Sequence, residues 1–409
     1  MNSPLQSFWL GGFESGCHVN RFGQRLDMIA LTGHDRQTAR DYVLLQSIGI
    51  HAARDGVRWH LIDRRSRFDF SSFAPMLEAA EQTGMQVIWT LCHYGWPLDC
   101  DILDPTFPRR FAEFAHAVAR FVRAHSSTVP FYTPVNEISF LAWGAGSCGF
   151  IYPFNRKRGD LVKKQFIRAA IAACDAIHAA DPRARFVHTD PIINIVARRD
   201  APHDEETARR RREFQFEALD GIAGRRHPEL GGDPRYLDII GLNYYHDNQF
   251  EHDGVTLPWC GEPLDDRWVP LHQLLHEVGR RYNRPILLAE TSHFAGQRAE
   301  WIRTISREIQ LALTSGVPLI GACIYPIIDR PGWECLSHWH RSGLWDLSPG
   351  ENGRLYRTPA ADPIAEFLEA QRAVGTLLRA QAPAPGHAPT SSAPSPAVVH
   401  GPMRGLIAR

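Results

Sequence analysis

The sequence predicts an α/β protein built as one (β/α)8 barrel with extended βα loops over residues 1–382. Strand-like and helix-like segments alternate about eight times along the chain. Several strand-like segments are continuous apolar and β-branched runs, which are typical of buried parallel strands. Two of these runs, residues 129–137 and 285–291, stop abruptly at a glutamate, Glu137 in the first and Glu290 in the second.

Length and composition are compatible with one such barrel, because barrels of this type run to roughly 250 residues or more as one domain and this chain has 409. The 45 basic and 45 acidic residues balance, so no field of one sign would draw nucleic acid or an anionic membrane to the surface. The eight cysteines are scattered without a Cys-x-x-Cys pair, which indicates buried thiols in a reducing compartment. With no secretion signal and no apolar run of roughly 18 residues, we expect a soluble, cytoplasmic protein.

Apolar runs and helical spacing give the expected order of elements. We expect strands at residues 8–14, 50–59, 86–94, 129–137, 184–191, 236–245, 285–291 and 318–329. We expect helices at residues 38–47, 71–83, 108–125, 160–180, 271–281, 301–315 and 361–381. The charged stretch 201–222 predicts a solvated helix, and the Gly-rich and aromatic stretch 138–154 predicts a long rim loop. Residues 383–409 are rich in Pro, Ala and Ser and predict a disordered tail.

The two strand-end glutamates are the first candidates for a site. In a (β/α)8 barrel the C-terminal ends of the strands converge on one mouth, so Glu137 and Glu290 can face each other across it. A single rim glutamate is more often a salt-bridge partner or a helix cap. A facing pair suits glycoside hydrolysis, in which one carboxyl donates a proton to the leaving oxygen and the other attacks the anomeric carbon.

Other polar residues lie at the predicted strand ends. Arg58 is either a solvated rim charge or a cation that keeps a catalytic carboxylate ionised. His93 is either a core histidine or a sugar-facing donor beside aromatic residues. His18 lies in the loop after the first strand, where polar residues are ordinary, whereas Asn243 and Tyr245 lie at the mouth of the sixth strand.

On its motifs the chain resembles the family 1 β-glycosidases, in the clan of retaining (β/α)8-barrel hydrolases, to about residue 375. The segment Thr133-Pro-Val-Asn136-Glu137 is similar to the strand-four signature, which implies Glu137 as acid/base and Asn136 as a donor to the sugar 2-hydroxyl. Ala289-Glu290-Thr-Ser partly meets the nucleophile motif. The resemblance therefore implies Glu290 as nucleophile, with Arg58 and Tyr245 as its neighbours.

Three further motifs extend the resemblance. TLCHYGWP implies that His93 contacts the glycone, and GLNYY matches the strand-six motif that contains Asn243 and Tyr245. YPIIDRPGW followed by SGLWD is similar to the strand-eight loop, with Trp333 in register with a sugar-binding tryptophan, on whose face a pyranose ring can stack.

The chain also departs from the family pattern. His18 stands where the family has a glycone-binding glutamine. Gly332 stands where it has a glutamate, although Glu334 lies two residues on. These positions contact the sugar hydroxyls in the family, so the resemblance does not imply which sugar is bound.

The expected function is a retaining β-glycoside hydrolase, similar to β-glucosidases and β-galactosidases, acting on a small-molecule glycoside or oligosaccharide by double displacement through a covalent glycosyl-enzyme. No cofactor is expected. Two alternatives stay open, a transglycosylase of the same clan and a non-catalytic carbohydrate-binding barrel. A metal-dependent hydrolase is disfavoured, because the acids and histidines of the rim show no metal-ligand spacing; these are Glu14, Asp190, His93 and His188.

Overall fold

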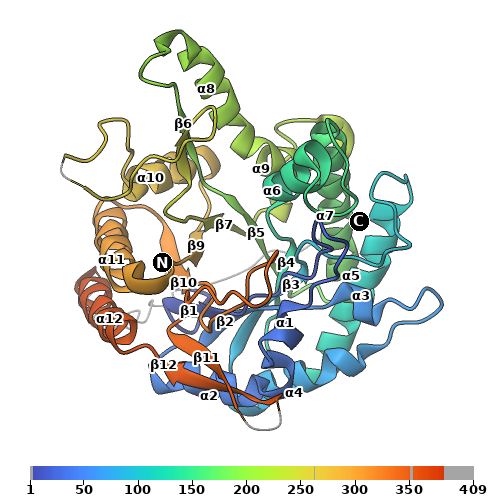
Figure 1. Ribbon diagram of the computed structural model, residues 1–409. Coiled ribbons are helices and arrows are strands. Elements are labelled where there is room, and N and C mark those ends of the chain that lie inside the picture. The colour runs from blue at the N-terminus through green and yellow to red at the C-terminus, as the bar shows by residue number, and fades with distance from the viewer. Residues whose placement is uncertain (1–2, 262, 351–352, 382–409) are drawn as a thin grey trace, which may run out of the picture.

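The chain forms a closed barrel of eight parallel strands, as the sequence predicts. The computed structural model describes residues 3–261, 263–350 and 353–381. The strands follow the ring order β1-β10-β9-β7-β5-β4-β3-β2, and Figure 1 shows the helices arranged around them. The predicted tail at residues 383–409 lies outside the described residues.

Each barrel strand lies inside its predicted range. The strands are β1 (Trp9–Gly12), β2 (Ala52–Gly56), β3 (Gln86–Cys92), β4 (Phe131–Val135), β5 (Arg185–Pro191), β7 (Ile239–Asn243), β9 (Ile286–Thr291) and β10 (Leu319–Ile324). Most are shorter than expected at their C-terminal ends. There the backbone leaves the hydrogen-bonded ladder and the last polar residues of each predicted run become the rim.

The predicted helices form with small shifts of their ends. They are α2 (Thr38–Ser47), α4 (Ala74–Thr83), α5 (Phe107–His125), α7 (Gly159–Ala180), α10 (Leu271–Tyr282), α11 (Arg298–Thr314) and α12 (Ala361–Gln381). Gly84 ends α4 with a left-handed φ of 67°, a conformation that glycine adopts without a steric cost.

Two expectations for the rim are wrong. The predicted rim loop at residues 138–154 contains α6 (Ile138–Leu141) and a π-helical segment, Ala142–Cys148. The predicted solvated helix at 201–222 divides into the mostly exposed α8 (Glu205–Glu213) and the buried α9 (Glu217–Ile222). Both differences arise from packing, because buried residues of α6 and α9 belong to the main hydrophobic core.

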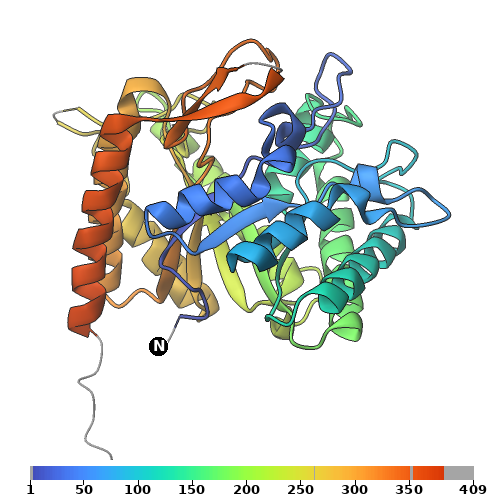
Figure 2. The ribbon, with the colours of Figure 1, turned by 90° about the horizontal axis from the view of Figure 1, so that it is seen from below.

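Short elements complete the rim. They are α1 (Met28–Leu31), α3 (Trp59–Ile62), the paired strands β6 (Asn194–Val196) and β8 (Gln249–Glu251), and the antiparallel strands β11 (Trp345–Pro349) and β12 (Leu355–Pro359). Figure 2 shows β11 and β12, in orange-red, crossing one end of the barrel. No helix among the described residues combines the length and apolarity needed to cross a bilayer.

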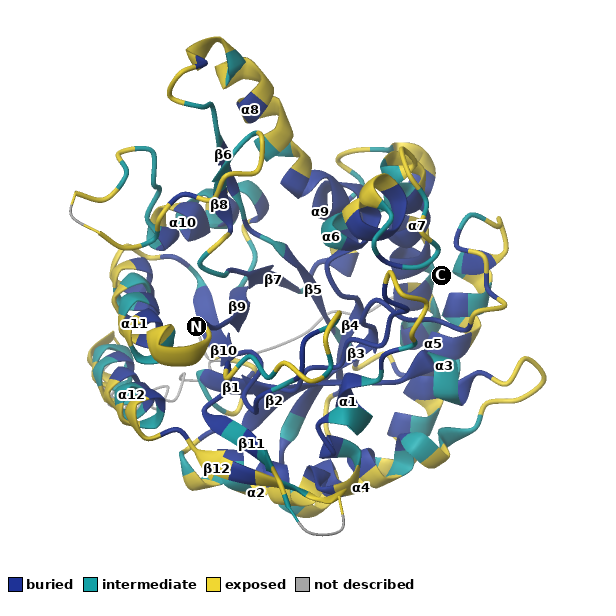
Figure 3. Cartoon of the chain, in the orientation of Figure 1, coloured by how far each residue is buried: buried dark blue, intermediate teal, exposed yellow. Residues whose placement is uncertain are grey.

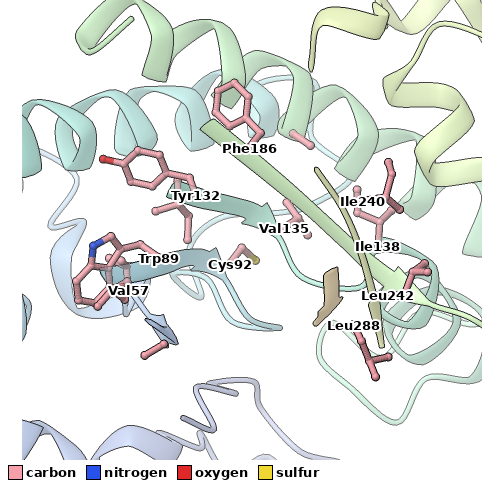
Figure 4. Close-up of a cluster of buried hydrophobic side chains, with 14 of the residues drawn as sticks. Val57, Trp89, Cys92, Tyr132, Val135, Ile138, Phe186, Ile240, Leu242 and Leu288 are labelled. Carbon is pink, nitrogen blue, oxygen red and sulfur yellow. The ribbon is translucent and has the colours of Figure 1, made fainter. Parts of the chain in front are cut away.

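Two apolar layers hold the barrel. The outer layer fills the space between the strands and the surrounding helices, and Figure 4 shows Tyr132 and Phe186 among its side chains. Exposed residues lie on the outward sides of the helices, as Figure 3 shows. The inner layer fills the barrel itself and comes from inward-facing positions of the strands, including Leu10, Ala52, Ile88, Phe131, Val187, Ile239 and Leu287. This apolar interior forms the base on which the polar residues of the mouth are placed.

Candidate active site

An extra residue in β9 places Glu290 inside the barrel. From Leu288 to Glu290 the strand advances by two residues, while the paired strand β7 advances by one, over residues 242–243. The pairing with β10 shifts in the same stretch. Ala289 belongs to the inner apolar layer, so simple alternation would turn Glu290 outward. The β-bulge turns it back toward the interior, a common use of bulges beside active sites.

The guanidinium of Arg54, in β2, organises this end of the barrel. Its Nη1 donates hydrogen bonds to the carbonyl oxygen of the bulged Ala289 at 2.7 Å and to Oε1 of Glu290 at 2.8 Å. Its Nη2 donates to Oδ1 of Asn136 at 2.8 Å. Burial acts to lower the pKa of Arg54, but the charge of Glu290, the hydrogen bond to it and the neighbouring Cys323 and Tyr325 together outweigh burial and raise the pKa. The guanidinium therefore stays charged, with Glu290 as its counter-charge.

The prediction that Arg58 lies beside Glu290 is wrong. Strand β2 ends at Gly56, so Arg58 lies beyond the ladder, before α3. Its guanidinium contacts the carboxylates of Asp27 and Asp35 at 3.2 and 3.3 Å. Arg54 takes the expected place because its side chain lies on the same strand face as the inward-facing Ala52, two residues before it.

The second oxygen of Glu290 also accepts a hydrogen bond. The hydroxyl of Tyr245 donates to Oε2 at 2.7 Å. The Glu290 side chain is 5% exposed. Donors on both oxygens fix the orientation of the carboxylate, and Tyr245 lies beside Glu290, where the family resemblance places it.

Glu137 follows β4 and has a different environment. Oε1 accepts a hydrogen bond from Nδ2 of Asn243 at 2.9 Å, and Oε2 accepts one from the hydroxyl of Tyr94. Burial raises the pKa of Glu137 to about 8, and the negative charge of Glu290 adds to the shift. Glu137 is therefore protonated at neutral pH.

The backbone is strained at both residues of the contact between Tyr94 and Glu137. Glu137 has φ of 50° and Tyr94 has φ of 66°. Both lie in the left-handed region, which costs a residue other than glycine of the order of 1–3 kcal/mol. Two strained residues whose side chains are hydrogen-bonded to each other indicate a functional constraint on both.

Asn136 connects the two glutamates. Its Oδ1 accepts hydrogen bonds from Arg54 and from the hydroxyl of Thr189, while its Nδ2 donates to the Tyr94 hydroxyl at 3.2 Å and to Nε2 of His93 at 3.3 Å. Burial, followed by the charge of Arg54, holds the pKa of His93 well below its usual range. His93 is therefore a neutral imidazole that lies beside the glutamate pair.

His18 and Trp333 form an aromatic wall against Tyr94. The ring centroids of His18 and Trp333 lie 4.6 Å apart at an interplanar angle of 72°, and those of Tyr94 and Trp333 lie 5.7 Å apart. Among the described residues, Nδ1 of His18 and Nε1 of Trp333 are buried and have no hydrogen-bond partner. No described protein group therefore satisfies these two buried polar atoms.

The structure brings most of the predicted residues into one connected cluster, namely Glu137, Glu290, His18, His93, Asn136, Asn243, Tyr245 and Trp333. Glu334 points elsewhere: its side chain is 46% exposed and forms an ion pair with Arg21. The substrate-binding role predicted for Glu334 therefore has no geometric support.

Sequence reasoning missed three residues of the cluster. Arg54 is a charged residue inside an apolar strand, and that unusual position was the available signal. Tyr94 follows His93 in the sequence, and its aromatic character alone does not indicate the contact with Glu137. Glu14 was considered only as a rim acid, yet its carboxylate is buried and lies 3.1 Å from Nε of Arg330, a pairing that sequence alone does not indicate.

Comparison with solved structures shows the same fold in two glycosidases and in a third enzyme. The β-glucosidase from Thermotoga maritima, in complex with deoxynojirimycin, gives a TM-score of 0.69 at 15% identity over 90% of this chain and 98% of that chain. The β-glycosidase from Pyrococcus horikoshii gives 0.67 at 17% identity over 84% and 85%. The AHE enzyme from Alicyclobacillus herbarius gives 0.67 at 16% identity over 83% and 87%.

Sequence comparison adds no closer relationship. No protein-family model matches the chain, and no curated protein matches it. The likeness to the solved glycosidases is therefore one of fold.

Replacing Glu290 with glutamine should lower the pKa of Glu137 from its value of about 8. The change removes the negative charge that opposes ionisation of Glu137, and it leaves Arg54 without its carboxylate partner, so both effects favour the Glu137 carboxylate. The measurement is a pH titration of the ¹³C-carboxyl resonance of Glu137. Glu81→Gln, at an exposed position of α4, is the control, and an unchanged midpoint in Glu290→Gln would show that the two carboxyl groups do not interact.

Proposed function

We propose that the chain is a retaining β-glycoside hydrolase, similar to β-glucosidases and β-galactosidases. The observation that carries the proposal is the contrast between two buried glutamates in one cluster. Glu290 has a guanidinium as counter-charge, while the pKa of Glu137 is raised to about 8. A carboxylate paired with a cation, beside a second carboxyl group whose pKa is raised, is the arrangement that acid-base glycoside hydrolysis requires.

In the first step of the proposed mechanism, an oxygen of Glu290 attacks the anomeric carbon. The bond from that carbon to the leaving oxygen breaks, and Glu137 transfers its proton to the leaving oxygen. Arg54 and Tyr245 hold the attacking carboxylate in position through its two oxygens. The product of this step is a glycosyl ester on Glu290 and a free alcohol.

In the second step Glu137 acts as the base. Once Glu290 is esterified it carries no charge, so the second-largest of the causes that raise the pKa of Glu137 is removed. The Glu137 carboxylate then takes a proton from water while the water oxygen attacks the anomeric carbon and releases Glu290. The same pair of residues thus supplies the acid in one step and the base in the next.

The shared fold supports the proposal from a second direction. The solved β-glucosidase from Thermotoga maritima was crystallised with deoxynojirimycin and, separately, with glucoimidazole. We infer that this chain also takes a small-molecule sugar at the mouth of its barrel. The neutral imidazole of His93 and the amide of Asn136 lie beside the glutamate pair and form part of the proposed sugar site.

Glu290→Ala should abolish hydrolysis, by roughly 10⁴-fold or more, because the covalent step loses its nucleophile. The assay is nitrophenol release from a panel of nitrophenyl β-glycosides: glucoside, galactoside, mannoside, fucoside and xyloside. Added azide should restore turnover in the variant by attacking the anomeric carbon in place of the carboxylate, giving a glycosyl azide of inverted configuration. Glu81→Gln is the control, and wild-type activity in Glu290→Ala would remove the assignment.

Glu137→Ala should slow the first step according to the leaving group. Dinitrophenolate departs without a proton, so its release should change little, whereas alkyl glycosides should lose roughly 10²- to 10⁴-fold. In the wild type, kcat/KM should fall as pH rises through about 8, because Glu137 then loses the proton it must donate. The variant should lack this alkaline limb. Equal losses across all leaving groups would contradict the role of Glu137 as the acid.

Arg54→Lys should lower kcat/KM by roughly 100-fold, and Arg58→Lys by less than about tenfold. A lysine ammonium keeps the charge but lacks the planar fork that reaches the Ala289 carbonyl, Glu290 and Asn136 together. Thermal melts of both variants show whether each is folded. The opposite ranking would restore Arg58 as the cation of the site.

A further inference from the structure

We propose that Glu14 is a sugar-binding residue that accepts a hydrogen bond from a glycone hydroxyl and restricts the site to neutral glycones. The inference rests on the proposed hydrolase function. That mechanism uses Glu137 and Glu290 and leaves the buried Glu14 carboxylate without a role.

The Glu14 carboxylate has acceptor capacity to spare. Oε1 accepts a hydrogen bond from the backbone N–H of Gly16 at 2.8 Å, and Oε2 lies 3.1 Å from Nε of Arg330. A carboxylate offers about four lone-pair directions, so these two partners do not saturate it. The side chain is only 4% exposed, so bulk water does not readily supply the remaining donors.

The open side of Glu14 faces the cluster. Nε2 of His93 lies 4.0 Å from Oε1 of Glu14, which is too long for a direct hydrogen bond. A hydroxyl that donates to Oε1 of Glu14 at an ordinary hydrogen-bond length of about 2.8 Å would lie beside the His93 ring. His93 is itself hydrogen-bonded to Asn136, so this position lies next to the glutamate pair.

The indole nitrogen of Trp333 lies near the Glu14 carboxylate. A Cβ added at Gly16 would meet Oε1 of Glu14 at 2.9 Å and Nε1 of Trp333 at 3.8 Å, so these two atoms are within about 7 Å of each other. One hydroxyl, or two on adjacent carbons, spans that distance with hydrogen bonds of about 2.8 Å. Nε1 of Trp333 and Nδ1 of His18 are buried and unpartnered among the described residues, a state that is costly until a ligand satisfies it.

Charge pairing at this end favours a neutral ligand. Each guanidinium that contacts a carboxylate of the cluster already has its partner, Arg54 with Glu290 and Arg330 with Glu14. The Arg330 guanidinium also lies 5.5 Å from the centroid of the Trp333 ring. A uronate or a phosphorylated sugar would bring a second negative charge next to Glu14 without releasing either cation. A neutral sugar would only have to donate hydroxyl hydrogens.

The test compares wild type with Glu14→Gln on 3-, 4- and 6-deoxy nitrophenyl β-glycosides and on their parent glycoside. Glutamine keeps the shape and the Gly16 contact. The variant should lose roughly 10- to 150-fold in kcat/KM on the parent, the range for a hydrogen bond to a charged group. For the wild type, removal of at least one hydroxyl from the substrate should lower kcat/KM strongly relative to the parent glycoside. For the variant, removal of the same hydroxyl should lower kcat/KM much less. Equal deoxy penalties in both proteins would overturn the proposal.

A second arm uses anionic substrates. Glu14→Gln leaves Arg330 without its carboxylate, so the ratio of kcat/KM on the nitrophenyl glucuronide to that on the glucoside should rise at least roughly tenfold. Glu81→Gln should leave the ratio unchanged. A ratio that stays at the wild-type value in Glu14→Gln would contradict the charge-based restriction.

A binding measurement separates this inference from the hydrolase proposal. Calorimetry with methyl β-glycosides is carried out on Glu290→Gln and on the double variant Glu14→Gln, Glu290→Gln. If the wild type cleaves no glycoside but binding weakens with the Glu14 change, the hydrolase proposal fails and the sugar-binding role of Glu14 stands. If the wild type is active and the Glu14 change affects neither binding nor the deoxy penalties, the role of Glu14 fails alone.

Discussion

The site depends on one buried guanidinium. Arg54 is held 1% exposed inside the barrel and donates to the carbonyl of the bulged Ala289, to Glu290 and to Asn136. The bulge frees a carbonyl that needs a donor, and the charge of Glu290 needs a partner, so one side chain from β2 satisfies both. Its hydrogen bond to Asn136 also fixes the residue that directly precedes Glu137. The β-bulge in β9 and the pairing of charges between Arg54 and Glu290 therefore depend on the same side chain.

The two glutamates differ because of what surrounds them. Glu290 receives a cation on one oxygen and a phenol on the other, whereas Glu137 receives two uncharged donors, Asn243 and Tyr94. Burial without a counter-charge raises the pKa of Glu137, and the neighbouring negative charge raises it further. The strained backbone at Glu137 and Tyr94 has a stability cost, which the surrounding barrel must offset.

Sequence was sufficient for the barrel, because apolar runs that stop at polar residues mark strand ends in a parallel sheet. The strand-end glutamates came from the same pattern, whereas His18 and Trp333 came from the resemblance to the family 1 β-glycosidases. Sequence failed for Arg58, since periodicity does not show where a strand stops pairing and β2 ends two residues earlier. It could not show the bulge at Ala289, which exists only relative to β7 and β10. The pairing of Glu14 with Arg330 joins opposite ends of the chain and likewise depends on barrel closure.

The inner apolar layer has a consequence for how this molecule could change over evolutionary time. Inward-facing residues such as Leu10, Ile88 and Val187 supply cohesion without taking part in the polar network above them. A buried ion pair contributes little net stability, and apolar replacements of similar volume are often neutral or stabilising. Apart from Tyr325, which contacts both, the inner layer and the polar network consist of different side chains, so the proposed reaction could be lost, or exchanged for another, while the same scaffold continued to fold.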